Sequence, residues 1–145
     1  MRKMLFTLAL LTIFAIPALA VTFTAIGTPL GGGTAAITAV DNSLVYLGTA
    51  KGNIYSQHIT TGAFTKLANV GEPITAIVYP GATYTYVGTS KGNIYRHTIS
   101  GNAINKTALA DCKVKDAGIV GMKWDATLSK IWLVDNKGRT FSCTP

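Results

Sequence analysis

The chain is poor in charge, cysteine and histidine, and it lacks the motifs by which many enzyme classes are recognised. Only 13% of its 145 residues are charged, which disfavours long helices exposed to solvent. Two cysteines and two histidines without ligand spacing do not form a zinc signature, so we predict no metal site. No nucleophile elbow and no phosphate-binding loop occurs either. We therefore expect no catalytic residues, no cofactor and no enzymatic activity.

The two histidines, His58 and His97, belong to related segments but occupy registers that differ by one residue. A shift of one residue in a β-strand sends a side chain to the opposite face. This disfavours a shared metal site or a paired acid–base role. We expect each to be a surface histidine or a hydrogen-bonded strand histidine.

The first 20 residues have the layout of a secretory signal peptide. Arg2 and Lys3 form a short basic start, an apolar run extends from Met4 to Ile16, and Ala18-Leu19-Ala20 supplies small residues for cleavage. The apolar run is short for crossing about 30 Å of hydrocarbon as a helix. We predict cleavage after Ala20, a periplasmic or secreted mature protein that starts at Val21, and no stable membrane insertion.

The basic charge does not indicate a nucleic-acid partner. The whole chain has a formal net charge of +7, and without Arg2 and Lys3 the remaining 11 basic and 6 acidic residues leave about +5. The cations are spread singly along the sequence, mostly at turns or on outward strand positions, instead of forming a patch. We expect no nucleic-acid binding.

The two cysteines, Cys112 and Cys143, are separated by 31 residues. Disulfides are common in exported proteins, and the pair would close a loop whose entropy contributes roughly 3–4 kcal/mol. We predict a disulfide between them, with two free thiols as the alternative.

The sequence repeats itself, and the repeat predicts its secondary structure. LVYLGTAKGNIY (44–55) is followed 40 residues later by YTYVGTSKGNIY (84–95), and a diverged copy, IWLVDNKGRTF (131–141), lies a further 46 residues along. Each copy indicates a β-hairpin whose turn glycine, Gly52, Gly92 or Gly138, supplies a positive φ. Strand-like runs flank each hairpin, so we expect four short antiparallel strands per repeat.

The repeats cover most of a single β domain over residues 21–145. Their expected bounds are about 34–70, 73–110 and 117–145. The third copy ends before a fourth strand, whereas residues 21–27 resemble the fourth strand of the first copy. We expect this N-terminal strand to complete the third repeat.

The segment VYLGTAKGNIY (45–55) resembles blades of β-propellers of the quinoprotein-like and sensor-propeller kinds, in which a strand ending in Gly-Thr turns through glycine into an Ile/Val-Tyr strand. The third copy departs from it with Val134-Asp135 in place of Gly-Thr. The resemblance implies an all-β fold of three four-stranded, propeller-like blades.

Three blades are too few for a ring, because propellers typically have four to eight. We therefore predict a homo-oligomer, in which two chains give six blades, or assembly with another exported protein. The alternative fold is a β-trefoil or another threefold β fold, which closes as a monomer at this length.

Aromatic and amide side chains recur at equivalent positions and suggest a binding surface. Sugar-binding sites commonly combine aromatic rings that stack on the sugar with amide groups that hydrogen-bond to it. The candidate ligand-binding residues are Asn53, Tyr55, Asn93, Tyr95 and Phe141. The alternative is that these aromatics pack between repeats while the asparagines serve the turns. The sequence thus predicts a non-enzymatic interaction module that self-assembles through its repeats, with a glycan-binding lectin as the alternative function.

Overall fold

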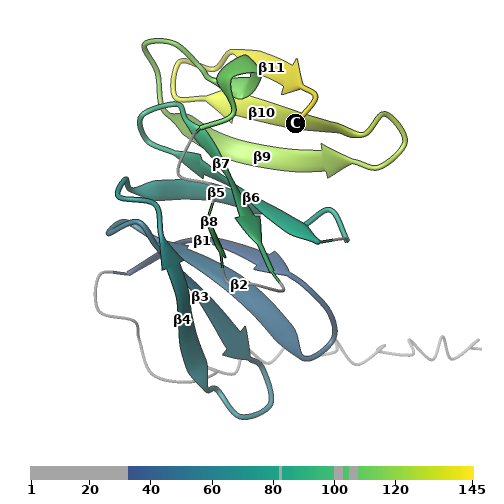
Figure 1. Ribbon diagram of the computed structural model, residues 1–145. Coiled ribbons are helices and arrows are strands. Elements are labelled where there is room, and N and C mark those ends of the chain that lie inside the picture. Colours follow the sequence, from purple (N-terminus) through teal and green to yellow (C-terminus); the bar gives the residue numbers. More distant parts are fainter. Residues whose placement is uncertain (1–32, 82, 100–102, 105–107) are drawn as a thin grey trace, which may run out of the picture.

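A computed structural model gives the structure of the chain and describes residues 33–81, 83–99, 103–104 and 108–145. The described residues form three antiparallel β-sheets (Figure 1). Their secondary structure is otherwise limited to one turn of 3-10 helix, η1 (Ala110–Cys112). The expected signal peptide and the strand expected over residues 21–27 lie outside the described residues.

Each sheet is built from consecutive strands of one repeat, in the order of the chain. The first sheet comprises β1 (Thr34–Ala39), β2 (Leu44–Thr49), β3 (Asn53–His58) and β4 (Phe64–Asn69). The second comprises β5 (Ile74–Val78), β6 (Tyr84–Thr89), β7 (Ile94–Thr98) and the short β8 (Ala103–Ile104). The third comprises β9 (Ile119–Asp125), β10 (Lys130–Asp135) and β11 (Thr140–Cys143).

The central hairpin of each sheet has the turn that the repeat predicts. Gly52, Gly92 and Gly138 have φ values of 77°, 79° and 77°, a region that side-chain-bearing residues rarely adopt. In the first sheet the hydroxyl of Thr49 accepts a hydrogen bond from the backbone N–H of Asn53, 3.1 Å away. In the third sheet a carboxylate oxygen of Asp135 accepts the equivalent bond from Arg139, at 2.8 Å. Asp135 therefore closes its turn as the threonine does.

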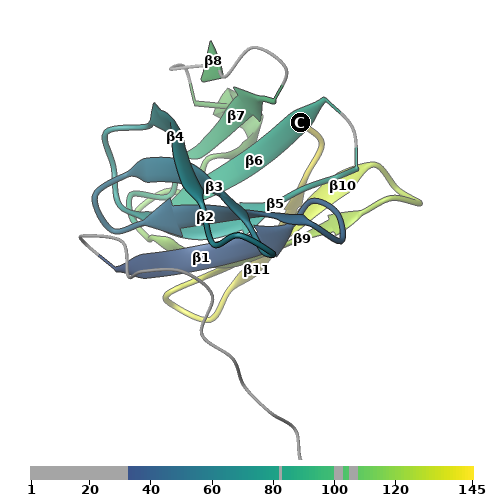
Figure 2. The ribbon, with the colours of Figure 1, turned by 90° about the horizontal axis from the view of Figure 1, so that it is seen from below.

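The sheets stack face to face, with the third at the top and the first at the bottom of Figure 1. Their first strands lie next to one another: β1 contacts β5, and β5 contacts β9 (Figure 2). The apolar core accordingly divides into two layers. The layer between the first and second sheets contains Tyr46, Ile54, Ile74, Ile77, Val87 and Tyr95. The layer between the second and third contains Ala76, Val78, Tyr86, Ile94, Ile119, Ile131 and Leu133.

Cys112 and Cys143 are joined by a disulfide, with their Cα atoms 5.2 Å apart, in line with the expected pairing. Cys112 lies in η1, on the connection from the second sheet, and Cys143 ends β11. Both are buried in the second core layer. The bridge therefore ties the last strand of the third sheet to the segment that enters it.

In the part of the chain that the structure describes, each strand pairs only with strands of its own repeat. A trefoil would require strands of different repeats to pair in a barrel, so the trefoil alternative does not describe this arrangement. The stack does agree with separate four-stranded units, although the third has three described strands. These three sheets form an open stack, not a closed ring.

Candidate interaction surface

The two internal sheet interfaces depend on a glycine that lets the next sheet approach. A Cβ atom built on Gly48 would lie 3.0 Å from the Cβ of Ile74 and would collide with its Cγ2. A Cβ on Gly88 would lie 2.9 Å from Ile119 Cγ2 and 2.5 Å from Met122 Sδ. Each glycine is the penultimate residue of the second strand of its sheet, and each isoleucine begins the first strand of the next. The sheets can therefore stack this closely only because Gly48 and Gly88 have no side chain.

The third sheet carries Val134 at the position of Gly48 and Gly88, and the structure describes no sheet against it. Because directly paired residues share a face, Trp132 lies with Lys123 and Ser142, and Val134 with Gly121 and Thr140. Two large apolar side chains stand on this outer face, since Trp132 and Val134 are 40% and 38% exposed. We call it the C-terminal face.

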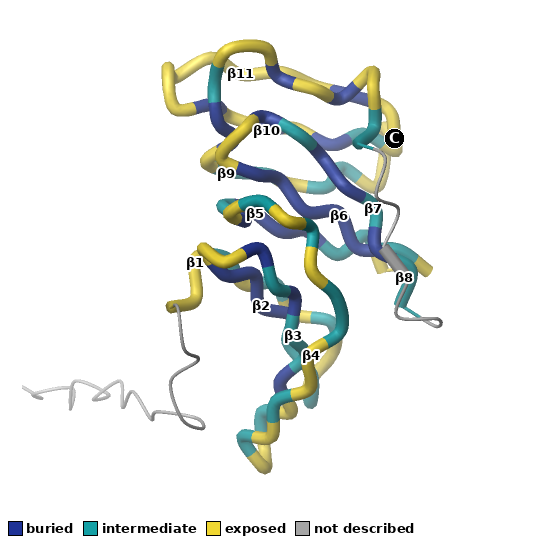
Figure 3. Tube along the Cα trace, turned by 60° about the vertical axis from the view of Figure 1, so that its left-hand side comes forward, coloured by how far each residue is buried: buried dark blue, intermediate teal, exposed yellow. Residues whose placement is uncertain are grey.

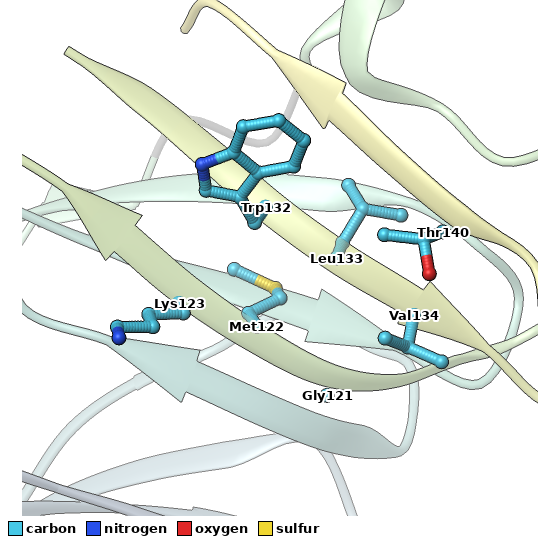
Figure 4. Close-up of a pocket in the computed structure, with 7 residues that line it drawn as sticks. All are labelled: Gly121, Met122, Lys123, Trp132, Leu133, Val134 and Thr140. Atoms are coloured by element: carbon cyan, nitrogen blue, oxygen red, sulfur yellow. The ribbon is translucent and has the colours of Figure 1, made fainter. Parts of the chain in front are cut away.

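The C-terminal face is hollowed at its centre. A depression of about 230 Å³ is lined mainly by apolar atoms, and a Cβ built on Gly121 would meet no described atom within 4 Å. Figure 4 shows Trp132 and Val134 standing along β10, with Lys123 and Gly121 on the neighbouring β9. The residues that line it are Gly121, Met122, Lys123, Trp132, Leu133, Val134 and Thr140.

The opposite end of the stack is the outer face of the first sheet, which we call the N-terminal face. Ile37 on β1 is 63% exposed there, whereas Ile77, its counterpart in the second sheet, is 6% exposed. The two are equivalent because Ile37 pairs with Leu47 and Ile77 pairs with Val87. Figure 3 shows the contrast between the largely exposed β1 and the buried β5. The same strand position is thus a core position inside the stack and a surface position at its end.

The candidate ligand-binding residues lie on three different sheets, and only Asn93 and Tyr95 share a cluster. Both donate to the carboxylate of Glu72, on the connection from the first sheet: the Asn93 amide at 3.0 Å and the Tyr95 hydroxyl at 3.2 Å. The Thr89 hydroxyl donates a further bond at 2.7 Å. Glu72 therefore ties the second sheet to the connection that precedes it.

The other three candidates have different surroundings. The carboxamide oxygen of Asn53 accepts a hydrogen bond from Asn69 at 2.6 Å, at the end of the first sheet. Tyr55 is half-buried on β3. The Phe141 ring lies 5.4 Å beneath the guanidinium of Arg139. The described residues do not assemble the five candidates into one site, and their role in binding a ligand stays a prediction.

Glu72 was not singled out from the sequence, because it lies between repeats and has no counterpart in the periodic pattern. Burial alone would raise the pKa of this carboxyl, but hydrogen bonds from Thr89, Asn93 and Tyr95 favour its charged form more strongly. The pKa of Glu72 is therefore held below its ordinary value. The anion fixes the relative position of the two segments.

The two histidines take opposite faces of equivalent strands, as their registers predict, since His58 pairs with Leu44 whereas His97 pairs with Thr85, the counterpart of Val45. His58 is exposed and His97 is fully buried. The expectation of a surface or hydrogen-bonded histidine is wrong for His97, because neither ring nitrogen has a hydrogen-bond partner among the described residues. Its ring meets Tyr46 of the first sheet edge-on, with the centroids 6.3 Å apart. Burial lowers the pKa of His97 and favours the neutral ring.

The described residues contain neither a metal-binding cluster nor a membrane-spanning helix. No group of three or more His, Cys, Asp or Glu side chains there is placed to hold a metal ion. No helix in that part of the chain is long and apolar enough to cross a membrane.

Comparison with known proteins gives a neighbour in structure and no relative by sequence. No protein-family model matches the chain, and no curated protein matches it. Among solved structures, the computationally designed Ika4 protein is similar over 85% of this chain and 99% of its own, with a TM-score of 0.54 and 12% sequence identity. At that identity the likeness concerns the fold alone.

Proposed function

We propose that this protein is an exported, non-enzymatic interaction module whose propeller-like sheets assemble with further copies of the chain. The observation that carries the proposal is the C-terminal face. In the first and second sheets the equivalent face is covered by the next sheet, whereas in the third it exposes Trp132 and Val134 beside a hollow. Contiguous exposed apolar surface of this kind is typical of interaction sites.

Export is part of the proposal. The signal-peptide layout of residues 1–20 supports it, and the Cys112–Cys143 disulfide is compatible with an oxidising compartment, either periplasmic or extracellular. The third sheet is also proposed to take residues 21–27 as its fourth strand. The edge of β11 that faces away from β10 has no partner among the described strands, and such an edge is a template for pairing.

The hydrogen bonds that the candidate sugar-binding residues already make within the chain favour self-assembly over the lectin alternative. The Asn93 amide and the Tyr95 hydroxyl are already directed at Glu72, so a glycan would have to displace an anionic acceptor. The C-terminal face offers apolar side chains instead, and these suit a protein surface.

The test is the solution mass of the processed, disulfide-bonded protein, measured by multi-angle light scattering over a range of concentrations. We expect a mass above that of one chain. Trp132→Ala should weaken self-association at least tenfold, because buried aromatic side chains dominate interface energies. Leu128→Ala is the matched control: Leu128 is 54% exposed but lies in the turn between β9 and β10, and its loss should leave association unchanged.

A strictly monomeric protein at all concentrations would refute the proposal. A monomer that binds on a glycan array, and loses that binding in Asn93→Ala, would support the lectin alternative instead.

A further inference from the structure

The third sheet ends in a strand edge that is covered in the other two sheets. β4 pairs with β3 in the first sheet, and β8 pairs with β7 in the second. The outer edge of β11, the equivalent strand of the third sheet, has no partner among the described strands, and three of its four residues are exposed. The third sheet is therefore one strand short, and its open edge can accept an added strand.

The pairing of β4 with β3 gives the register in which residues 21–27 would meet β11. Thr24 corresponds to Thr65 of β4, because each follows a phenylalanine in similar segments. Thr65 pairs with Ser56, and the residue of β11 that is equivalent to Ser56 is Ser142. An antiparallel strand over residues 21–27 would thus set Thr24 opposite Ser142.

The connection from this segment to β1 has the length of a crossing between neighbouring sheets. It comprises residues 28–33. Within the stack, residues 70–73 lead from β4, the outer strand of the first sheet, to β5, the first strand of the second. Four residues therefore suffice to cross from the outer strand of one sheet to the next sheet. Six residues suit the same crossing into β1 from a sheet beside it.

The third sheet of the same chain is not beside β1. β5 lies between β1 and β9, and Figures 1 and 3 show β11 as the strand of the third sheet farthest from β1. With sheets about 10 Å apart and strands about 4.8 Å apart, a strand beyond β11 lies about 25 Å or more from β1. The chain from Gly27 to Gly33 spans at most about 20–22 Å when fully extended. Gly33 is not extended, because its φ is 69°.

We propose that residues 21–27 pair with β11 of a second copy, and that two copies exchange these strands reciprocally. This inference rests on the proposed function and names the segment that joins the copies. Such an exchange of identical elements is a common route to a closed dimer. The junction differs from the internal interfaces, because Val134 stands where those need a glycine. Residues 28–33 exceed residues 70–73 by two residues, which gives the partner's sheet room for another register.

The length of the connection tests the exchange. Eight glycine and serine residues inserted between Gly31 and Gly32 let the segment reach β11 of its own chain. Pairing within the chain then wins, because its effective concentration is on the order of millimolar. We expect dimerisation at least tenfold weaker than that of the wild type, by analytical ultracentrifugation of the processed protein. The same insertion between the exposed Thr60 and Thr61, in the turn between β3 and β4, is the control and should leave dimerisation unchanged.

Cross-linking between two different chains identifies whose strand is paired. A chain with Thr24→Cys is refolded together with a chain with Ser142→Cys. A short bismaleimide should join the two chains, because opposed residues of paired strands have Cβ atoms about 4.5–5.5 Å apart. Thr65→Cys in place of Thr24→Cys is the control and should give no product, since Thr65 pairs within its own sheet.

The outcomes separate the exchange from self-assembly. If the wild-type protein dimerises but the insertion at Gly31 has no effect, or the two chains do not cross-link, the exchange is wrong and self-assembly stands. If the wild-type protein is monomeric at all concentrations, self-assembly and the exchange both fail.

Discussion

Gly92 offers a quantitative test of how the second sheet is held by the connection that follows it. Its φ is 79°, and a Cβ built there would collide with the carbonyl oxygen of Val114 and lie 2.5 Å from that of Ala117. Gly81, in the turn between β5 and β6, has a similar φ of 87°, but a Cβ there would meet no described atom within 4 Å. Alanine at the two positions therefore shares the backbone strain and differs in the collision.

The expected magnitudes follow from that difference. A side chain in the left-handed region costs about 1–2 kcal/mol at either position. At Gly92 the backbone of residues 114–117 must also move, and overpacking of this kind costs about 1–3 kcal/mol. Gly92→Ala should thus lower the free energy of unfolding by about 2–5 kcal/mol, and Gly81→Ala by about 1–2 kcal/mol.

Urea unfolding followed by circular dichroism measures both values, with the slope of the transition reporting whether the denatured state has changed. Losses that agree to within about 0.5 kcal/mol at the two positions would contradict the reasoning, because the connection would then not be packed on the Gly92 turn.

Three further predictions concern charge, burial and the disulfide. Glu72→Gln should lower the free energy of unfolding in urea by about 1.5–3 kcal/mol at pH 7. Because the folded-state pKa of Glu72 is lowered, the advantage of the wild-type carboxylate is fully present above pH 4.5, the ordinary pKa of this group. The advantage should be lost as the pH falls through the lower folded-state pKa. His97 has a lowered folded-state pKa, so the unfolded chain binds its proton first and wild-type stability should fall as pH drops below 6.5, by at most about 1.4 kcal/mol per pH unit. The unfolding midpoints of His97→Gln should lack this loss between pH 7 and 5, whereas the exposed His58→Gln control should keep it. Replacing Cys112 and Cys143 together by serine should cost roughly 3–4 kcal/mol for the 31-residue loop, and an unchanged unfolding midpoint would show that the bridge does not constrain the unfolded chain.

The repeat made much of the fold predictable. Its copies fixed the position of each central hairpin, and the turn glycines have the positive φ that the pattern requires. The three sheets span residues 34–69, 74–104 and 119–143, within the expected repeats. Local alternation and turn chemistry suffice for this because each strand pairs with a neighbour in the sequence.

The candidate site was less predictable because its chemistry depends on contacts between repeats. Repeated Asn93 and Tyr95 suggested a ligand, but their polar groups meet Glu72, a residue outside the periodic pattern. His97 could be assigned to a face from its register. Its complete burial against Tyr46 could not be anticipated, since burial depends on how sheets stack.

The positions where the repeats disagree carry the information about assembly. Asp135 differs from Thr49, yet it closes the same turn with the equivalent backbone hydrogen bond, so this difference preserves the hairpin. Val134 differs from Gly48 in a way that the internal packing could not tolerate, because a side chain there would occupy the space of the next sheet. The third sheet can therefore carry Val134 only because no sheet packs on it in the register of the two internal interfaces.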